Sequence, residues 1–286
     1  KFKNIWIQPA SGDAGGAVGA ALSIWHQKLK KERIINSIDK MQGSFLGPSY
    51  SETEIQNELN EIDAKYTKHS EDETIKKTAV LLSKGKTIGW FQGRMEFGPR
   101  ALGGRSIIAD PRSETMQTEL NLKIKFRESF RPFAPSILDS EVNKWFELED
   151  ESPYMLLVSE IKNNKRLSLK EDELKLEGID LLNLKRSVVP AITHVDYSAR
   201  VQTVHKETNA RYYKLLYEFN KITGCPILVN TSFNVRGEPI VCSPIDAYRC
   251  FMGTNLDFLI IENFILDKQE QQVAGFTTYK DNYELD

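Results

Sequence analysis

Four arginines stand close together in a glycine-containing stretch of the sequence. The stretch is Gly93–Arg112, GRMEFGPRALGGRSIIADPR, and its arginines are Arg94, Arg100, Arg105 and Arg112. A guanidinium group binds phosphate or carboxylate through a planar fork of donors, and nearby glycines let main-chain amides approach the same anion. The alternative is that these arginines are solvated or paired with neighbouring carboxylates such as Glu96 and Asp110. Because so many guanidinium groups share one loop, we favour an anion-binding site.

A second basic cluster and a polar strand end point the same way. Lys125, Arg127 and Arg131 follow at K-x-R-E-x-x-R spacing, and Asn230–Ser232 come directly after a predicted buried strand. Loops at strand ends often carry ligand-binding groups, and amide and hydroxyl side chains supply neutral donors and acceptors. Taken alone, Asn230–Ser232 also fit a turn capped by an Asx or hydroxyl group.

Other candidate groups have simpler interpretations. His194 and Asp196, in THVDYSAR, resemble an acid–base pair, but a histidine that orients the loop bearing Arg200 is the favoured interpretation. Trp90 and Phe91 precede the arginine-rich stretch, and we expect them in the core rather than against an adenine ring.

The elements that must position these groups alternate without a regular βαβ rhythm. Apolar runs predict strands at Phe2–Ile7, Thr87–Phe91, Ile107–Ala109, Pro132–Leu138, Tyr154–Ile161, Ala199–Val204, Pro226–Val229, Phe258–Ile261 and Phe264–Leu266. Helical spacing and capping signals predict helices after the Ser51–Glu54 capping box and at Ala14–Lys31, Glu73–Ser83, Ser113–Ile124, Asn209–Ile222 and Ser243–Met252. The charged stretch Lys162–Arg186 is expected to be an exposed insertion without chemistry. The pattern predicts an α/β fold with a mixed sheet.

The composition narrows the class of function. The 286 residues include 38 basic and 40 acidic side chains, which gives a net charge of −2. Such a balance provides no global field for a nucleic-acid backbone or an anionic membrane, so any anion site depends on local clustering. Cys225, Cys242 and Cys250 form neither a C-x-x-C pair nor an even disulfide framework. We therefore expect structural, reduced thiols and a cytoplasmic protein, and no apolar run reaches the roughly 18 residues of a membrane span.

Four blocks of the sequence, in this order, resemble one enzyme family. FGPRALGGRSIIADPR, KFRESFRPFAPSIL, HVDYSARVQTV and NTSFNVRGEPIVCSP closely resemble the C-terminal domain of O-carbamoyltransferases, the enzymes that decorate nodulation factors and tailor antibiotics such as tobramycin and cephamycins. QPASGDAGGAVGAAL resembles the end of the family's preceding domain, which has the duplicated ATPase-like fold of actin and sugar kinases. The resemblance implies a YrdC-like domain over residues 41–286, with a twisted mixed sheet flanked by helices. Residues 1–40 would be a remnant of the ATPase-like domain and a linker, so we expect a fragment that lacks the full transfer site.

The family implies a two-step activity. The matching domain takes carbamoyl phosphate and ATP with Mg²⁺ and forms carbamoyl adenylate. The preceding domain transfers the carbamoyl group to the hydroxyl of a small-molecule acceptor, at a site assisted by Fe²⁺ or another divalent metal. The alternative is a YrdC-like module that binds phosphate, nucleotide or RNA without catalysis, although the near-neutral charge disfavours RNA. The acceptor and the oligomeric state, including a homodimer, stay open.

Carried over position by position, the resemblance also implies the site. The carbamoyl-phosphate pocket would comprise Arg100, Lys125, Arg131, Arg200, Asn230 and Ser232, with Arg127 at its edge. Arg100, Lys125 and Arg131 are the expected catalytic groups, because they can neutralise the phosphate as its bond breaks. Asp13 matches a metal-ligand position of the preceding domain, but this sequence contains no H-x-x-x-H pair to complete the ligand set. We expect Asp13 to bind metal only in the full-length enzyme, the alternative being a carboxylate at the start of a helix.

Overall fold

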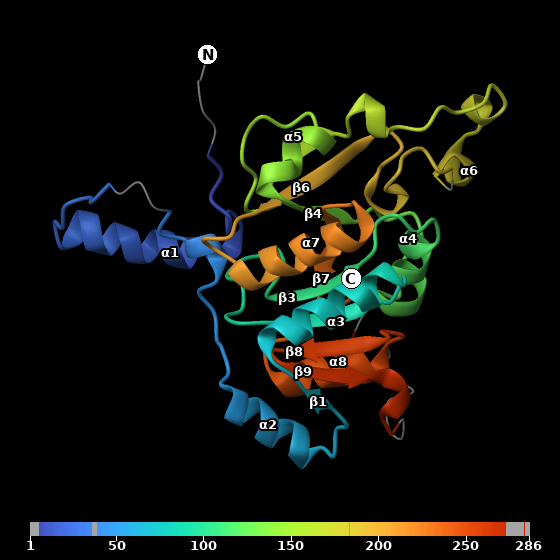
Figure 1. Cartoon of the computed structure of the whole chain (residues 1–286). Helices are drawn as coiled ribbons and strands as arrows, with labels where there is room; N and C mark the ends of the chain where they lie inside the picture. Colours follow the sequence, from blue (N-terminus) through green and yellow to red (C-terminus); the bar gives the residue numbers. More distant parts are fainter. Residues whose placement is uncertain (1–5, 36–38, 183, 273–282, 284–286) are drawn as a thin grey trace.

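One mixed nine-stranded sheet forms the framework of the computed structural model, which describes residues 6–35, 39–182, 184–272 and 283 (Figure 1). The strand order is β1-β9-β8-β2-β3-β7-β4-β6-β5. The strands are β1 Thr67–Lys68, β2 Ile88–Phe91, β3 Arg105–Ala109, β4 Ala134–Leu138, β5 Leu157–Glu160, β6 Ser198–Val204, β7 Ile227–Ser232, β8 Phe258–Ile261 and β9 Phe264–Asp267. β2 runs parallel to β8 and β4 parallel to β6, while the other neighbouring pairs are antiparallel. The predicted mixed α/β sheet is confirmed.

Helices flank this sheet. The described α-helices are α1 Asp13–Ser23, α2 Glu52–Glu61, α3 Glu71–Ser83, α4 Met116–Glu119, α5 Val142–Trp145, α6 Gly178–Leu182, α7 Ala210–Thr223 and α8 Pro244–Gly253. Wider π-helical turns at Ile24–Lys28 and Leu120–Ile124 extend α1 and α4, and 3₁₀ turns lie at Gln42–Ser44, Asp139–Glu141, Asn163–Lys165, Glu173–Lys175, Pro190–Ile192 and Lys268–Glu270. No helix in these described segments is long and apolar enough to cross a lipid bilayer.

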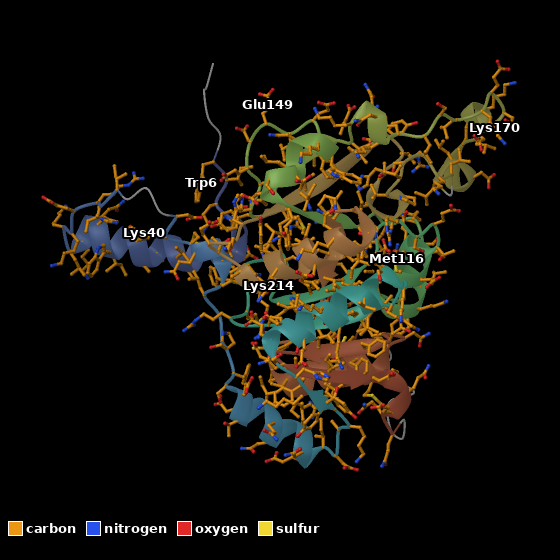
Figure 2. All side chains as sticks on the ribbon, in the orientation of Figure 1. Trp6, Lys40, Met116, Glu149, Lys170 and Lys214 are labelled. Carbon is orange, nitrogen blue, oxygen red and sulfur yellow. The ribbon has the colours of Figure 1, made fainter. Side chains whose placement is uncertain are left out.

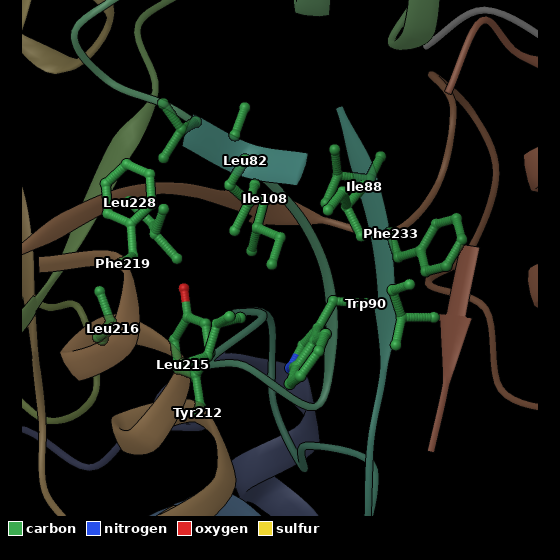
Figure 3. Packing of buried hydrophobic residues seen from close by; sticks show 14 of the residues in the cluster. Leu82, Ile88, Trp90, Ile108, Tyr212, Leu215, Leu216, Phe219, Leu228 and Phe233 are labelled. Atoms are coloured by element: carbon green, nitrogen blue, oxygen red, sulfur yellow. The ribbon is translucent and has the colours of Figure 1, made fainter. Parts of the chain in front are cut away.

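Part of the core lies between the sheet and the α3–α7 pair, which pack side by side (Figures 1 and 3). Buried residues of α2 and α8 belong to the same hydrophobic cluster. Side chains alternate across a strand, so Trp90 of β2 points toward Tyr212 of α7, with their rings 6.4 Å apart. Phe91 points to the opposite face, where its ring lies 6.0 Å from that of Tyr50. Both β2 aromatic side chains are buried, which confirms their predicted place in the core.

The stripe on α7 shows why its sequence folds as it does. Tyr212, Leu215, Leu216 and Phe219 are spaced to share one helix face, and all are fully buried (Figure 3). Burying such a side chain stabilises the fold by about 1.5–3 kcal/mol. Asn209 caps the first turn, and Gly224 ends the helix with a left-handed φ of 69°.

Capping residues fix other boundaries. The Ser51–Glu54 capping box opens α2 as predicted. A second box, Ser70 with Glu73, opens α3 two residues before the predicted start. Ser243 caps α8, whose first residue is Pro244. Each such cap contributes roughly 1 kcal/mol.

α1 projects from the rest of the structure (Figure 1). None of its residues is buried. Gly15 is required near its start, because a Cβ there would lie 2.0 Å from the Ala10 carbonyl oxygen. The helical region ends at Lys28 rather than Lys31.

Several predicted elements differ from the observed ones. The predicted strand Phe2–Ile7 lies mostly outside the described residues, and the helix predicted from Ser113 begins only at Met116. The strand predicted from Tyr154 begins at Leu157, after a left-handed φ of 55° at Met155. Within Lys162–Arg186, Lys170 lies at the far tip (Figure 2), while the bridge between Arg166 and Ser187 closes the base.

Candidate functional site

Three neighbouring strands bring predicted site residues to one end of the sheet. Asn230 and Ser232 lie at the carboxyl end of β7, and Arg200 lies near the start of β6. β4 separates these strands, with Ser136 pairing with Gln202 of β6. Because side chains alternate along each strand, these residues share one face of the sheet. Two strand spacings of about 4.8 Å each separate β7 from β6, so the groups on the two strands are neighbours in space.

A pocket of about 590 Å³ opens beside the end of β7. Its walls come from two loops, one after α4 and one after β7. The lining residues are Lys125, Arg127, Arg131, Ser232, Asn234, Val235, Arg236, Gly237, Glu238 and Pro239. Four of these side chains are basic and one is acidic, so the pocket favours an anion.

Lys125 forms the base of this pocket. The side chain is 3% exposed. Its Nζ lies 2.8 Å from the Ser232 carbonyl oxygen, 2.7 Å from the Asn234 carbonyl oxygen and 2.5 Å from Asn234 Oδ1. Burial lowers the pKa of Lys125 to about 7, and the neighbouring Arg127 cation acts in the same direction. The oxygen acceptors favour the charged form, so this ammonium both ties two loops together and titrates near neutral pH.

Arg127 stands at the edge of the pocket and is anchored from behind. Its Nε donates to Asn121 Oδ1 at 2.7 Å, and its guanidinium lies 4.9 Å from the centre of the Phe133 ring. Burial lowers the pKa of Arg127 to about 10, with repulsion from Arg131 as a second cause. The group stays charged at neutral pH in a fixed orientation.

Arg131 and Arg236 share one carboxylate. Arg131, whose side chain is 46% exposed, has its Nε 3.4 Å from Glu128 Oε2. Arg236 has its Nη1 3.2 Å from Glu128 Oε1. Glu128 is therefore an internal counter-ion between two pocket arginines.

Arg100 and Arg200 form a second basic group that does not line this pocket. The Nε atoms of both are buried and have no hydrogen-bond partner among the described residues. Burial lowers the pKa of Arg200, and repulsion from Arg100 lowers it further. Arg200 Nη2 contacts Met155 Sδ at 3.9 Å. Two close guanidinium groups with no carboxylate between them within the described chain are well suited to an anion.

Asn230 lies between the two basic groups. It is 1% exposed, and its Nδ2 lies 3.1 Å from the Ala101 carbonyl oxygen, 3.0 Å from Ser136 Oγ and 2.8 Å from Gln202 Oε1. Its Oδ1 is buried and has no partner among the residues described. The amide is thus fixed by its nitrogen end, which leaves an oriented acceptor.

The structure assigns the other three arginines of Gly93–Arg112 to internal contacts. Arg105 is fully buried, stacks 3.5 Å from the centre of the Phe91 ring and donates to backbone carbonyls that include those of Gln92 and Pro48. Arg112 pairs with Asp110, and Arg94 Nη1 donates to the Gly47 carbonyl oxygen. The alternative of internally paired arginines therefore holds for these three, and the anion-binding prediction narrows to Arg100.

Asn234, Arg236 and Glu238 belong to the pocket but were absent from the predicted set. All three stand in NTSFNVRGEP, the same block as Asn230 and Ser232. In the sequence, Arg236 stands directly before Gly237, and an arginine beside a glycine is a pattern that indicates an anion-binding loop. Gly237 has a left-handed φ of 78°. Asn230–Ser232 also lie within β7 rather than in a loop after it.

The remaining candidates lie elsewhere. Burial lowers the pKa of His194, and Asp196 Oδ1 accepts a hydrogen bond from the Ser198 amide at 3.0 Å. Cys225 and Cys250 are buried, and Cys242 is partly buried. Asp13 is an exposed residue in the first turn of α1. Among the described residues, no three His, Cys, Asp or Glu side chains form a cluster that could hold a metal ion, so Asp13 does not fit a metal site by itself there.

Comparisons with known proteins identify the family. The family model for the carbamoyltransferase C-terminus matches residues 79–268. A Synechocystis protein, described as uncharacterized protein sll1178, is 58% identical over 100% of this chain and 47% of its own length. Nodulation protein NolO of Bradyrhizobium diazoefficiens is 39% identical over 96% of this chain and 47% of its own length. Nodulation protein NolNO of Sinorhizobium fredii is 38% identical over 94% of this chain and 36% of its own length.

The chain thus spans less than half the length of these relatives. The crystal structure of full-length HypF in its phosphate- and nucleotide-bound form is also similar. The similarity covers 65% of this chain and 21% of the HypF chain, with a TM-score of 0.41 and 20% sequence identity. The chain belongs to the carbamoyltransferase family, and residues 79–268 match its C-terminal domain.

Proposed function

We propose that this chain activates the carbamoyl group in an ATP-dependent O-carbamoyltransferase. It binds carbamoyl phosphate and Mg²⁺–ATP and forms carbamoyl adenylate. In this proposal residues 41–286 are the YrdC-like activating domain, and residues 1–40 belong to a preceding ATPase-like domain. Transfer to an acceptor hydroxyl, with its divalent metal, takes place in the part of the longer relatives that this chain does not span.

This proposal rests on two neighbouring basic sites with the side-chain amide of Asn230 between them. The reaction needs room for two phosphorylated substrates. Arg100 and Arg200, whose Nε atoms have no partner in the described part of the chain, form one basic group, and the pocket over Lys125 forms the other. Asn230 Oδ1, which has no partner among the residues that the structure describes, is a suitable acceptor for the amino group of a carbamoyl substrate.

Adenylate formation depends on substrate positioning and charge neutralisation and does not need a nucleophile from the protein. The carbamoyl oxygen forms a bond to the α-phosphorus of ATP as the bond to pyrophosphate breaks. Water takes up the phosphoryl group that the carbamoyl oxygen loses, so the products are carbamoyl adenylate, phosphate and pyrophosphate. Fixed cations stabilise the charge that develops on the departing phosphates.

Isotope exchange tests the proposal. Labelled pyrophosphate should enter ATP only when carbamoyl phosphate is present, because the exchange requires a reversible adenylate. Arg100→Ala and Arg131→Ala should each reduce the exchange rate. Carbamoyl-phosphate binding without any exchange, in a folded preparation, would support a binding module and overturn the catalytic claim.

A further inference from the structure

The loop that carries Arg100 needs anchors of its own. It joins β2 to β3, whose last and first residues, Phe91 and Arg105, pair across the sheet. The intervening residues form no helix or strand. Such a segment samples many conformations unless specific contacts fix it, so Arg100 depends on whatever closes the loop.

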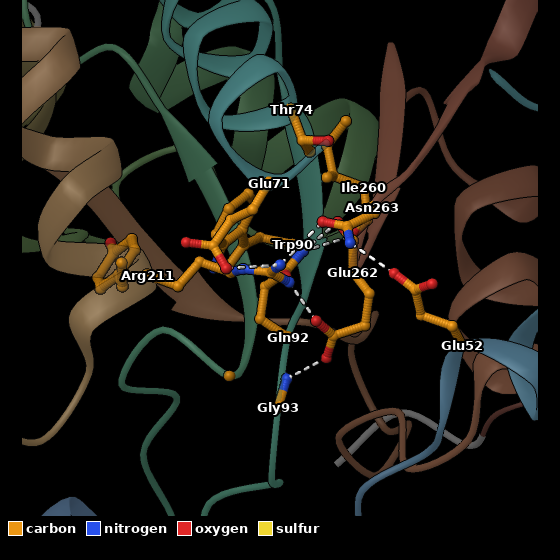
Figure 4. Close-up of polar contacts among 12 residues, drawn as sticks. Glu52, Glu71, Thr74, Trp90, Gln92, Gly93, Arg211, Ile260, Glu262 and Asn263 are labelled. Atoms are coloured by element: carbon orange, nitrogen blue, oxygen red, sulfur yellow. Dashed lines mark hydrogen bonds and ion pairs between the residues drawn. The ribbon is translucent and has the colours of Figure 1, made fainter. Parts of the chain in front are cut away.

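The start of this loop is fixed by an ionic network on its outer side (Figure 4). Gly93 donates its amide to Glu262 Oε1 at 2.5 Å, and Arg211 pairs with the same carboxylate. Arg211 Nη1 also lies 2.5 Å from Gln92 Oε1. These contacts anchor Gln92 and Gly93, but they do not reach the part of the loop around Arg100.

A single buried carboxylate closes the remainder of the loop. Glu96 is 7% exposed. Its Oε1 accepts from the Leu102 amide at 2.6 Å and from the Gly104 amide at 2.7 Å, and its Oε2 accepts from the Arg105 amide at 3.1 Å. Main-chain amides hold this carboxylate by hydrogen bonds, and the Arg105 guanidinium attracts it electrostatically.

Gly104 leaves room for the Glu96 carboxylate. A Cβ on Gly104 would lie 2.8 Å from the Arg94 carbonyl oxygen and 3.0 Å from Glu96 Oε2. The Glu96 carboxylate therefore fits closely against the backbone of Gly104, where no larger residue has room. Three hydrogen bonds to a charged acceptor are among the stronger contacts that a loop can contain.

Arg100 lies on the arc that the Glu96–Leu102 contact closes. Two contacts hold the other side of that arc against the sheet: Asn230 Nδ2 donates to the Ala101 carbonyl oxygen at 3.1 Å, and Gln202 Nε2 donates to the Leu102 carbonyl oxygen at 2.9 Å. Gln202 is two residues from Arg200 on β6. The arc is thus fixed beside the strand that carries the second guanidinium.

We propose that Glu96 is a positioning residue for substrate binding: its carboxylate closes the Arg100 loop and holds this guanidinium beside Arg200 for the anionic substrate. The inference rests on the proposed function, because it takes Arg100 to contact carbamoyl phosphate. The contacts of Glu96 are to the main chain of the loop, so in this proposal its effect on affinity passes through Arg100.

A double-mutant cycle separates positioning from general stability. Carbamoyl-phosphate affinity is measured by calorimetry for the parent chain, Glu96→Gln, Arg100→Ala and the double variant. Losing the charged acceptor should weaken binding about tenfold, the scale of one charged hydrogen bond. In the Arg100→Ala background the same change should have almost no further effect. Wild-type affinity in Glu96→Gln, or fully additive losses, would overturn the inference.

Glu73→Gln is the matched control. Glu73 is also a carboxylate that accepts a backbone amide, in the capping box of α3. Its variant should lose stability without losing affinity. If Glu96→Gln does not fold, Ser106→Ala replaces it in the double-mutant cycle. Ser106 Oγ accepts a hydrogen bond from the amide of Gly103, a residue of the Arg100 loop, at 3.0 Å. The loss of affinity in Ser106→Ala should likewise disappear in the Arg100→Ala background. An unchanged affinity in Arg100→Ala refutes the proposed site, whereas a weakened Arg100→Ala with an unchanged Glu96→Gln refutes only the role of Glu96.

Discussion

The buried ammonium of Lys125 should make anion binding depend on pH. Burial lowers its pKa to about 7, so the group is protonated below neutrality and neutral above it. A protonated ammonium attracts an anion and a neutral amine does not. The affinity of the pocket should therefore be highest below the pKa and should fall as the pH rises through it.

The size of the effect follows from the protonated fraction. One pH unit below a pKa of about 7, about nine-tenths of the groups carry a proton, and one unit above it about one-tenth do. If the anion binds only to the charged form, its affinity falls about tenfold across this range. Arg127, with a pKa of about 10, keeps its charge throughout, so some affinity remains.

Sulfate is the right probe, because it stays a dianion at both ends of this range. Its dissociation constant is measured by calorimetry at about pH 6 and pH 8, for the parent chain and for Lys125→Met. The parent should show the tenfold change. The variant, which keeps a side chain of similar length without a titrating group, should show a flat profile. Equal affinities at both pH values in the parent, or an equal slope in the variant, would refute the reasoning.

Three further substitutions test other contacts. Arg100→Ala should weaken carbamoyl-phosphate binding by about 1.5–3 kcal/mol, the scale of a charged hydrogen bond, as measured by calorimetry. Glu128→Gln should strengthen sulfate binding, because it removes the counter-ion that Arg131 and Arg236 share. Arg105→Met should lower the free energy of unfolding by at least about 3 kcal/mol, because several buried carbonyls lose their donor; urea denaturation measures this loss.

Each of these has a clear contrary result. An unchanged calorimetric titration removes Arg100 from the site. Weaker sulfate binding in Glu128→Gln would mean that this carboxylate organises the pocket rather than competing for it. An Arg105→Met variant as stable as the parent would mean that water replaces the lost donors.

Local signals predicted local structure well. The Ser51–Glu54 box and the apolar stripe of α7 gave the correct helices, because capping and amphipathic spacing act within a few residues. α3 begins at Glu71, before the predicted Glu73, because Ser70 caps its first turn. The Leu120–Ile124 region forms a wide π-helical turn, which no simple apolar period distinguishes from an α-helix.

The site was predictable as a set of residue types but not as a set of partners. Arg100 and Arg105 look alike in the sequence, and the Nε of each is buried without a partner among the described residues. Only Arg105 is fully buried with terminal nitrogens that donate to backbone carbonyls, whereas Arg100 is partly exposed. The difference depends on Pro48 and Gln92, which reach Arg105 only in the folded chain. Lys125 likewise meets Asn234 across a long sequence separation, which no local pattern encodes.

The position of β7 has a consequence for biosynthesis. This strand lies between β3 and β4 in the sheet, although it follows both of them in the sequence. A nascent chain emerges N-terminus first, so β3 and β4 each have an unpaired edge until β7 has been made. Unpaired edges invite association with other chains, and long-range pairing of this kind is slow. A chain that ends before Ile227 would contain Arg100, Lys125 and Arg131 but would lack the strand beside which they assemble, so anion binding reports that β7 has been made and has paired.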